Sequence, residues 1–224
     1  MQMGVKVKRA GLKESVIILL IVATALILPH SGLVPFPFFY GLPILLLIGL
    51  YLRYEGENFA YVGLTLKGLS LKPLLIGTIA AIILFCFLQY IFFPLLESFI
   101  VFEDVEVPLY DQIRGNLGYY LFILLMGWII GGLYEEIVFH GFIFTHIEKL
   151  FPNQIAAPAS FVITGLLFGL YHVQLGWAGA INACLAGMAY HGLILYFKRN
   201  LWYGIFFHAV FDTIAITMLY LEYF

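Results

Sequence analysis

Long apolar stretches, each with few charged residues, alternate with short polar segments along most of the chain. Several of these stretches approach the roughly 20 residues that an α-helix needs to cross a lipid bilayer. The pattern predicts an all-α fold, a polytopic transmembrane helical bundle of about seven spans that forms a single integral membrane domain over residues 1–224. The expected spans cover residues 14–29, 34–52, 71–96, 117–148, 155–174, 177–197 and 201–222.

The composition agrees with a membrane setting. Hydrophobic residues make up 63% of the chain and charged residues 11%, and the mean hydropathy is +1.01, well outside the range of soluble domains. The net charge of -2 comes without a basic stripe or a glycine-rich phosphate loop, so we expect no nucleic-acid partner. The expected surroundings are the lipid bilayer, with the acidic stretch 97–114 as an exposed loop or a surface helix.

The basic residues predict the orientation, because cytoplasmic loops of membrane proteins are enriched in Lys and Arg. With seven spans and a cytoplasmic N-terminus, only Arg114 of the basic residues falls on the outer face. The others, on the inner face, are Lys6, Lys8, Arg9, Lys13, Arg53, Lys67, Lys72, Lys149, Lys198 and Arg199. We therefore expect a multi-pass protein of the cell membrane with its N-terminus in the cytoplasm and its C-terminus outside.

Ionisable side chains occur inside three of the expected spans. Such groups are costly in a membrane interior, so they indicate function by default. They are Glu135, Glu136 and His140 in the fourth span, His172 in the fifth, and His208 and Asp212 in the seventh. With a rise of about 1.5 Å per residue, Glu135, His172 and Asp212 each lie roughly 20–24 Å from the cytoplasmic end of their helix. If the three helices are neighbours, these groups meet at a common depth.

Spacing along the helices relates the groups further, because residues four apart share a helix face. Glu136 and His140 form such a pair, and so do His208 and Asp212. Glu135 points about 100° away from Glu136 on an α-helix. One carboxylate can therefore face a cavity while His140 holds the other.

These residues resemble the motifs of the CAAX-protease and bacteriocin-processing (CPBP) family of intramembrane proteases, which includes the type II CAAX prenyl-proteases. The string EEIVFH at 135–140 is similar to the family's E-E-x-x-x-R motif, FGLYH at 168–172 matches F-x-x-x-H, and HAVFD at 208–212 matches H-x-x-x-N/D. The motifs follow the family's order and lie in a core region of about 118–216. His140 departs from the family pattern, since it stands where arginine, which is permanently charged, is usual.

The resemblance implies an intramembrane endopeptidase whose partner is a peptide or a lipidated protein substrate, either a prenylated CAAX protein or a leader-bearing peptide. It implies that Glu135 and His172 activate a water molecule, and that His208 and Asp212 stabilise the oxyanion or position this water. It also implies a glutamate mechanism without a metal or another cofactor. The supporting residues would be Glu136, His140 and Phe168.

Three alternatives stay open. One glutamate and two histidines can bind zinc with an open fourth position, and the candidate ligands would be Glu135, His172 and His208. The substituted His140 is compatible with a non-proteolytic immunity or scaffold protein of the membrane. A transporter or proton relay also uses intramembrane carboxylates and histidines, although the chain lacks the inverted repeats that are typical of transporters.

Overall fold

The computed structural model describes residues 9–34, 38–103 and 108–223. Every regular element in these ranges is helical, so the prediction of an all-α fold is confirmed. The helices are α1 (Leu12–Ile27), α2 (Gly41–Tyr54), α3 (Leu71–Phe87), α4 (Phe93–Glu97), α5 (Pro108–Ile113), α6 (Leu117–Met126), α7 (Phe144–Glu148), α8 (Ala156–Tyr171), α9 (Gly176–Tyr196) and α10 (Trp202–Tyr220). The π-helical segments η3 (Leu88–Phe92) and η4 (Gly127–Ile143) join α3 to α4 and α6 to α7, and short 3₁₀ turns cover Leu28–His30, Leu66–Gly68 and Val173–Leu175.

Several helices are long and apolar enough to cross a membrane. In the described part of the chain there are five of these: Leu12–His30, Leu71–Glu97, Leu117–Glu148, Val173–Tyr196 and Trp202–Tyr220. The 14 residues of α2 and the 16 of α8 rise only roughly 21 and 24 Å, less than the hydrocarbon thickness of about 30 Å. The chain is therefore a multi-pass membrane protein with five candidate spans, and a total of seven stays a prediction.

Two expected boundaries differ from the helices that form. The second expected span begins at residue 34, whereas α2 begins at Gly41, and residues 35–37 lie outside the described residues. The fifth expected span runs to residue 174, whereas α8 ends at Tyr171 and a 3₁₀ turn follows. In the acidic stretch 97–114 the short helix α5 forms, and residues 104–107 lie outside the described ranges.

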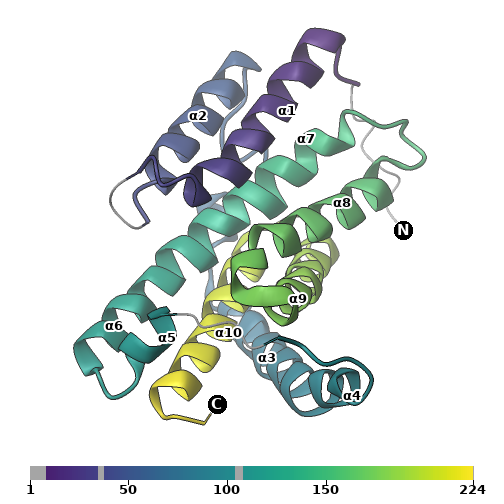
Figure 1. Cartoon of the computed structure of the whole chain (residues 1–224). Helices are drawn as coiled ribbons and strands as arrows, with labels where there is room; N and C mark the ends of the chain where they lie inside the picture. The colour runs from purple at the N-terminus through teal and green to yellow at the C-terminus, as the bar shows by residue number, and fades with distance from the viewer. Residues whose placement is uncertain (1–8, 35–37, 104–107, 224) are drawn as a thin grey trace.

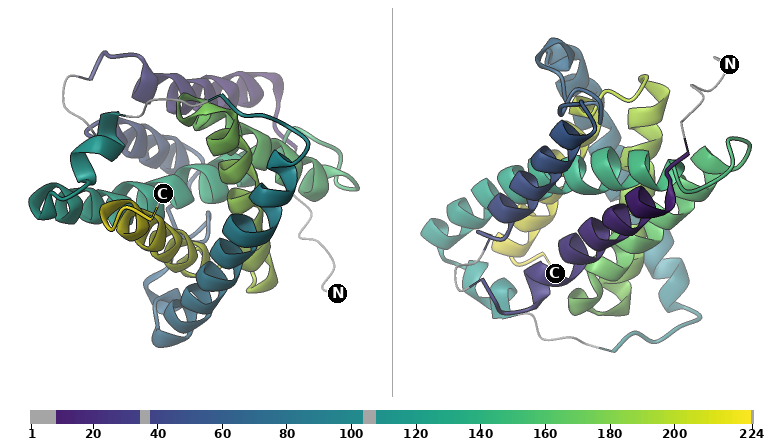
Figure 2. Two further views of the ribbon diagram at one scale, coloured as in Figure 1. Left: turned by 60° about the horizontal axis from the view of Figure 1, so that its bottom comes forward. Right: turned by 90° about the horizontal axis from the view of Figure 1, so that it is seen from above.

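The continuous helix formed by α6, η4 and α7 runs through the middle of the molecule (Figure 1). Helices α1 and α2 lie along one side of it, and α8, α9 and α10 lie along the other (Figure 2). Every residue from 134 to 148 is buried, as expected for an apolar helix that neighbours surround. The carboxylates of this helix therefore lie in the interior of the bundle.

Glycines bring α10 close to η4. A Cβ atom at Gly132 would lie 2.7 Å from Cβ of Ala209 and 3.1 Å from the carbonyl oxygen of Ile205. Small residues allow helix backbones to approach in this way inside membranes. Because Gly132 comes three residues before Glu135, this approach places the two carboxylates of η4 beside the histidine of α10.

Ion pairs join several helix ends at one end of the bundle. Nζ of Lys149 lies 2.6 Å from Oε1 of Glu55, and Nε2 of His146 lies 2.8 Å from Oε2 of the same carboxylate. The guanidinium of Arg199 donates hydrogen bonds of 2.7 and 2.8 Å to both carboxylate oxygens of Glu148. Lys149 and Arg199, which the sequence pattern assigns to the cytoplasmic face, therefore lie at the same end of the molecule.

Candidate active site

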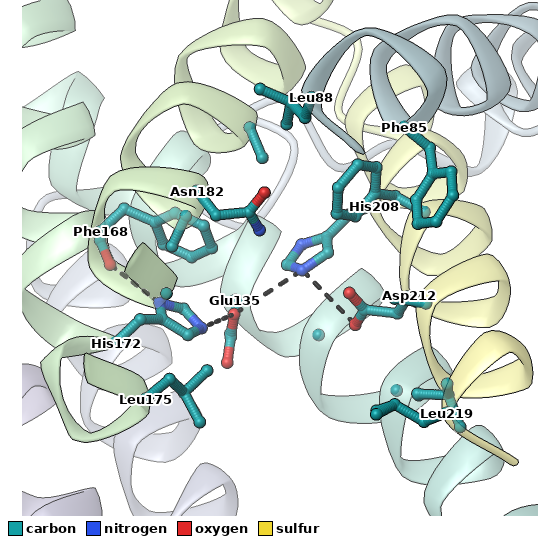
Figure 3. Close-up of a pocket in the computed structure, with 18 of the residues that line it drawn as sticks. Phe85, Leu88, Glu135, Phe168, His172, Leu175, Asn182, His208, Asp212 and Leu219 are labelled. Atoms are coloured by element: carbon teal, nitrogen blue, oxygen red, sulfur yellow. Dashed lines mark hydrogen bonds and ion pairs between the residues drawn. The ribbon is translucent and has the colours of Figure 1, made fainter. Parts of the chain in front are cut away.

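A cavity of about 600 Å³ lies between η4, α3, α8, α9 and α10. Its lining includes Glu135, His172, His208 and Asp212 (Figure 3). The structure thus brings together the four side chains that the sequence pattern selects as catalytic candidates. Glu136 lies behind this wall with a fully buried side chain.

Glu135 and His172 both lie on the cavity wall, and their side chains face each other. The distance from Oε2 of Glu135 to Nε2 of His172 is 3.8 Å, which is longer than a hydrogen bond. Among the residues that the structure describes, Oε2 of Glu135 has no hydrogen-bond partner. Buried polar atoms in native proteins normally have partners, so this oxygen is an exception within the described part of the chain.

The end of α8 orients His172. The residue is the C-terminal cap, with φ of -104° and ψ of 11°, rather than part of the helix. Its Nδ1–H donates a 2.9 Å hydrogen bond to the carbonyl oxygen of Phe168. A carbonyl oxygen can only accept, so the neutral imidazole carries its proton on Nδ1 and directs the lone pair of Nε2 toward Glu135.

His208 connects both carboxylates of η4. Its Nδ1 lies 3.0 Å from Oε1 of Glu136, whereas Nε2 lies 3.9 Å from Oε2 of Glu135 and 3.6 Å from Oδ2 of Asp212. A hydrogen bond to one ring nitrogen fixes the direction of the other. Glu136 therefore holds the imidazole so that Nε2 faces the cavity.

Glu136 contacts two histidines. Nε2 of His140, four residues along the chain, lies 3.7 Å from Oε1 of Glu136, within ion-pair range but beyond a hydrogen bond. The hydrogen bond of Glu136 goes to His208 on α10. Nδ1 of His140 hydrogen-bonds Nδ1 of His191 at 3.2 Å.

Aromatic rings surround the histidines of the site. Phe168 contacts His172 and His208 edge-on, with ring centroids 4.7 and 5.7 Å away. Tyr190 stacks on His208 at 4.7 Å and 23°. Phe168 therefore supports both imidazoles, as its motif position suggests.

Two residues near the site have no motif that could have selected them. His191 contacts His140, and Tyr190 covers His208, yet both lie on α9, outside the three motifs. The one available signal is an ionisable side chain, His191, in an apolar stretch.

The candidate zinc ligands are arranged more loosely than a metal site requires. Oε2 of Glu135 lies 3.8 and 3.9 Å from the Nε2 atoms of His172 and His208. Ligand atoms bound about 2.0–2.1 Å from a tetrahedral zinc ion are separated by about 3.3 Å. In the described part of the chain, no group of three or more His, Cys, Asp or Glu side chains is placed to hold a metal ion. The three residues would have to move closer together to bind zinc.

Part of the chain matches a known protein family. Residues 117–214 match a family model described as type II CAAX prenyl endopeptidase Rce1-like. No curated protein and no solved structure matches the chain. The matched segment runs from α6 into α10 and contains all three motifs. Residues 117–214, somewhat under half of the chain, are therefore similar to the Rce1-like type II CAAX prenyl endopeptidase family.

Proposed function

We propose that this chain is an intramembrane endopeptidase in which Glu135 activates a water molecule to hydrolyse a peptide bond. One observation carries the proposal: Oε2 of Glu135 meets the Nε2 atoms of His172 and His208 on the wall of a cavity inside an apolar helical bundle. Ionisable groups at such a depth indicate function by default. The match to a peptidase family supports the choice of reaction.

The reaction consumes one water molecule. The carboxylate of Glu135 takes a proton as the water oxygen attacks the carbonyl carbon of the substrate. A C–O bond forms, and the carbonyl electron pair moves to the oxygen, which becomes an oxyanion. The C–N bond then breaks as Glu135 returns the proton to the leaving nitrogen, so the products are a carboxylic acid and an amine.

The geometry of the two acceptors suits this water. Oε2 of Glu135 and Nε2 of His172 are 3.8 Å apart, so one water oxygen can lie about 2.8 Å from both. If the water donates both hydrogens to these acceptors, its lone pairs stay free for attack. His208, held by Glu136, and Asp212 would position the water or the substrate from α10.

The membrane orientation bears on the substrate. We propose that the end with Lys149 and Arg199 faces the cytoplasm, because basic residues favour that side. The cavity extends to residues at the opposite ends of their helices, including Glu97 and Leu219. A substrate would enter from that end or laterally from the bilayer. These two routes do not distinguish a prenylated CAAX substrate from a leader-bearing peptide, so both belong in the first assays.

A cleavage assay tests the proposal. Purified protein in nanodiscs should shorten a peptide that ends in a prenylated Cys-a-a-X sequence or a leader-bearing peptide, with the products identified by mass spectrometry. Glu135→Gln and His172→Ala should lose this activity while they keep the thermal midpoint of the wild type. Glu97→Gln is the matched control, since Glu97 lines the same cavity away from the histidines. Full activity in Glu135→Gln would show that the base is wrongly assigned.

A further inference from the structure

The proposed site contains many hydrogen-bond acceptors and few donors. Nδ1–H of His172 is used by the carbonyl of Phe168, and, with Glu136 ionised, Nδ1–H of His208 is used by its carboxylate. With neutral imidazoles, both Nε2 atoms present lone pairs to the cavity, and ionised Glu135 can only accept as well. Peptide hydrolysis creates an oxyanion, which requires donors directed at the developing charge.

Asn182 supplies an amide group to the same cavity. It lies on the face of α9 that lines the cavity, together with the small residues Ala178, Gly179, Ala183 and Ala186. Figure 3 shows the amide of Asn182 directed into the space between His172 and His208. An amide side chain carries two N–H donors.

No structural role accounts for Asn182. Its side chain makes no hydrogen bond to any residue that the structure describes. By contrast, Asn58, Asn116 and Asn200 each hydrogen-bond a backbone group in a turn or at a helix end. The side chain is half-buried and lines the cavity, so its N–H donors are free to hydrogen-bond a group that binds there.

Other donors on the cavity wall are less suited to this role. Tyr190 stacks its ring flat on His208, and the hydroxyl of Tyr40 pairs with that of Tyr171 at 3.5 Å. Gln89 also lines the cavity, but it comes from η3, on the chain segment between α3 and α4. Gln89 has the same amide chemistry as Asn182 and is therefore a matched control.

We propose that Asn182 is a catalytic residue whose amide N–H donates a hydrogen bond to the oxyanion formed from the scissile carbonyl. This inference rests on the proposed function. The bond strengthens as charge develops on the oxygen, so it stabilises the transition state more than the bound substrate. The donor would act opposite to Glu135 and His172, which hold the water.

The experiment compares kcat and KM of purified wild type, Asn182→Ala, Asn182→Asp and Gln89→Ala on the peptide that the wild type cleaves. Loss of one oxyanion donor lowers kcat by about 10²–10³-fold, and both Asn182 variants should show this loss with KM changed by no more than about threefold. Asn182→Asp keeps the size of the side chain but replaces the donor with an acceptor. Gln89→Ala should keep the wild-type kcat.

A second measurement separates catalysis from folding. A peptide phosphinate, which mimics the tetrahedral intermediate, should bind Asn182→Ala more weakly by the same factor as kcat falls, whereas an uncleaved product peptide should bind equally well. If the wild type is active and Asn182→Ala keeps the same kcat, this inference alone is overturned. The donor would then be a protonated His208. A loss of kcat in Gln89→Ala and not in Asn182→Ala would also overturn it. A wild type that cleaves none of the peptides would overturn the proposed function, and this inference with it.

Discussion

Replacement of Gly131 by alanine should disable the site without unfolding the protein. A Cβ atom at Gly131 would overlap Oδ2 of Asp212 and lie 3.3 Å from Nε2 of His208. The overlapping atom is the end of a side chain that is 29% exposed. The carboxylate can therefore rotate into the cavity that it lines, and the backbone of α10 can stay in place.

The expected loss follows from the position that Asp212 gives up. Its Oδ2 lies 3.6 Å from Nε2 of His208 in the wild type, where the carboxylate can hydrogen-bond the water or the substrate. Loss of one such charged hydrogen bond in the transition state costs about 1.5–3 kcal/mol, which corresponds to a roughly 10- to 150-fold decrease in kcat/KM. The net stability cost should lie between about 0 and 2.5 kcal/mol, because alanine gains about 0.5–1 kcal/mol over glycine in a helix and this offsets part of an overpacking cost of about 1–3 kcal/mol.

Gly127→Ala is the matched control, one turn earlier on the same segment. Its Cβ atom would have its nearest neighbours at 3.3 Å, Cδ1 of Ile216, and at 3.5 Å, Cβ of Asp212. The assay is kcat/KM on the cleaved peptide, together with the thermal midpoint in detergent. Gly127→Ala should stay within about threefold of the wild type, as expected for a change of less than about 0.7 kcal/mol. Equal activity in the two alanine variants would refute the role given to the position of Asp212.

Three further predictions concern the surroundings of the site. His140→Leu removes the hydrogen-bond partner of buried His191 and should lower the free energy of unfolding by about 1–3 kcal/mol; an unchanged thermal midpoint would contradict this contact. Burial alone would raise the pKa of Glu55, but hydrogen bonds from His146 and Lys149 lower it from 4.5 to about 2. The stability that this carboxylate adds is therefore fully present above pH 4.5 and is lost as the pH falls through about 2, and Glu55→Gln should flatten that part of a stability profile measured against pH. Cleavage should survive exhaustive chelation, whereas loss with recovery on added zinc would favour the metal alternative.

The sequence predicts the location of the candidate site because ionisable groups are so costly in a membrane interior. Glu135, His172 and Asp212 interrupt long apolar stretches at similar distances from basic helix ends, and these three residues line one cavity in the structure. Helical rise predicts a common depth for them if the three helices are neighbours. The basic residues Lys149 and Arg199 likewise lie at one end of the bundle, as their pattern predicts.

Details that depend on packing were beyond the sequence. Glu136 keeps its contact with His140 and also hydrogen-bonds His208 on another helix, a bond that spacing along one helix does not predict. His172 looks like part of a span, yet α8 ends just before it. That Asn182 has no hydrogen-bond partner among the described residues is visible only once the neighbouring helices are in place, because an asparagine in a helical bundle more often bonds to another helix.

The central claim is that Glu135 is the base of a peptidase, and single-turnover cleavage of the identified peptide by wild type and Glu135→Gln tests it most directly. The glutamine keeps the shape of the side chain but cannot take a proton from water, and removal of a general base costs about 10²–10⁴-fold in rate. The account predicts a loss of this size in a variant that binds the peptide as tightly and melts at the same temperature as the wild type. A Glu135→Gln variant that cleaves at the wild-type rate would contradict the account.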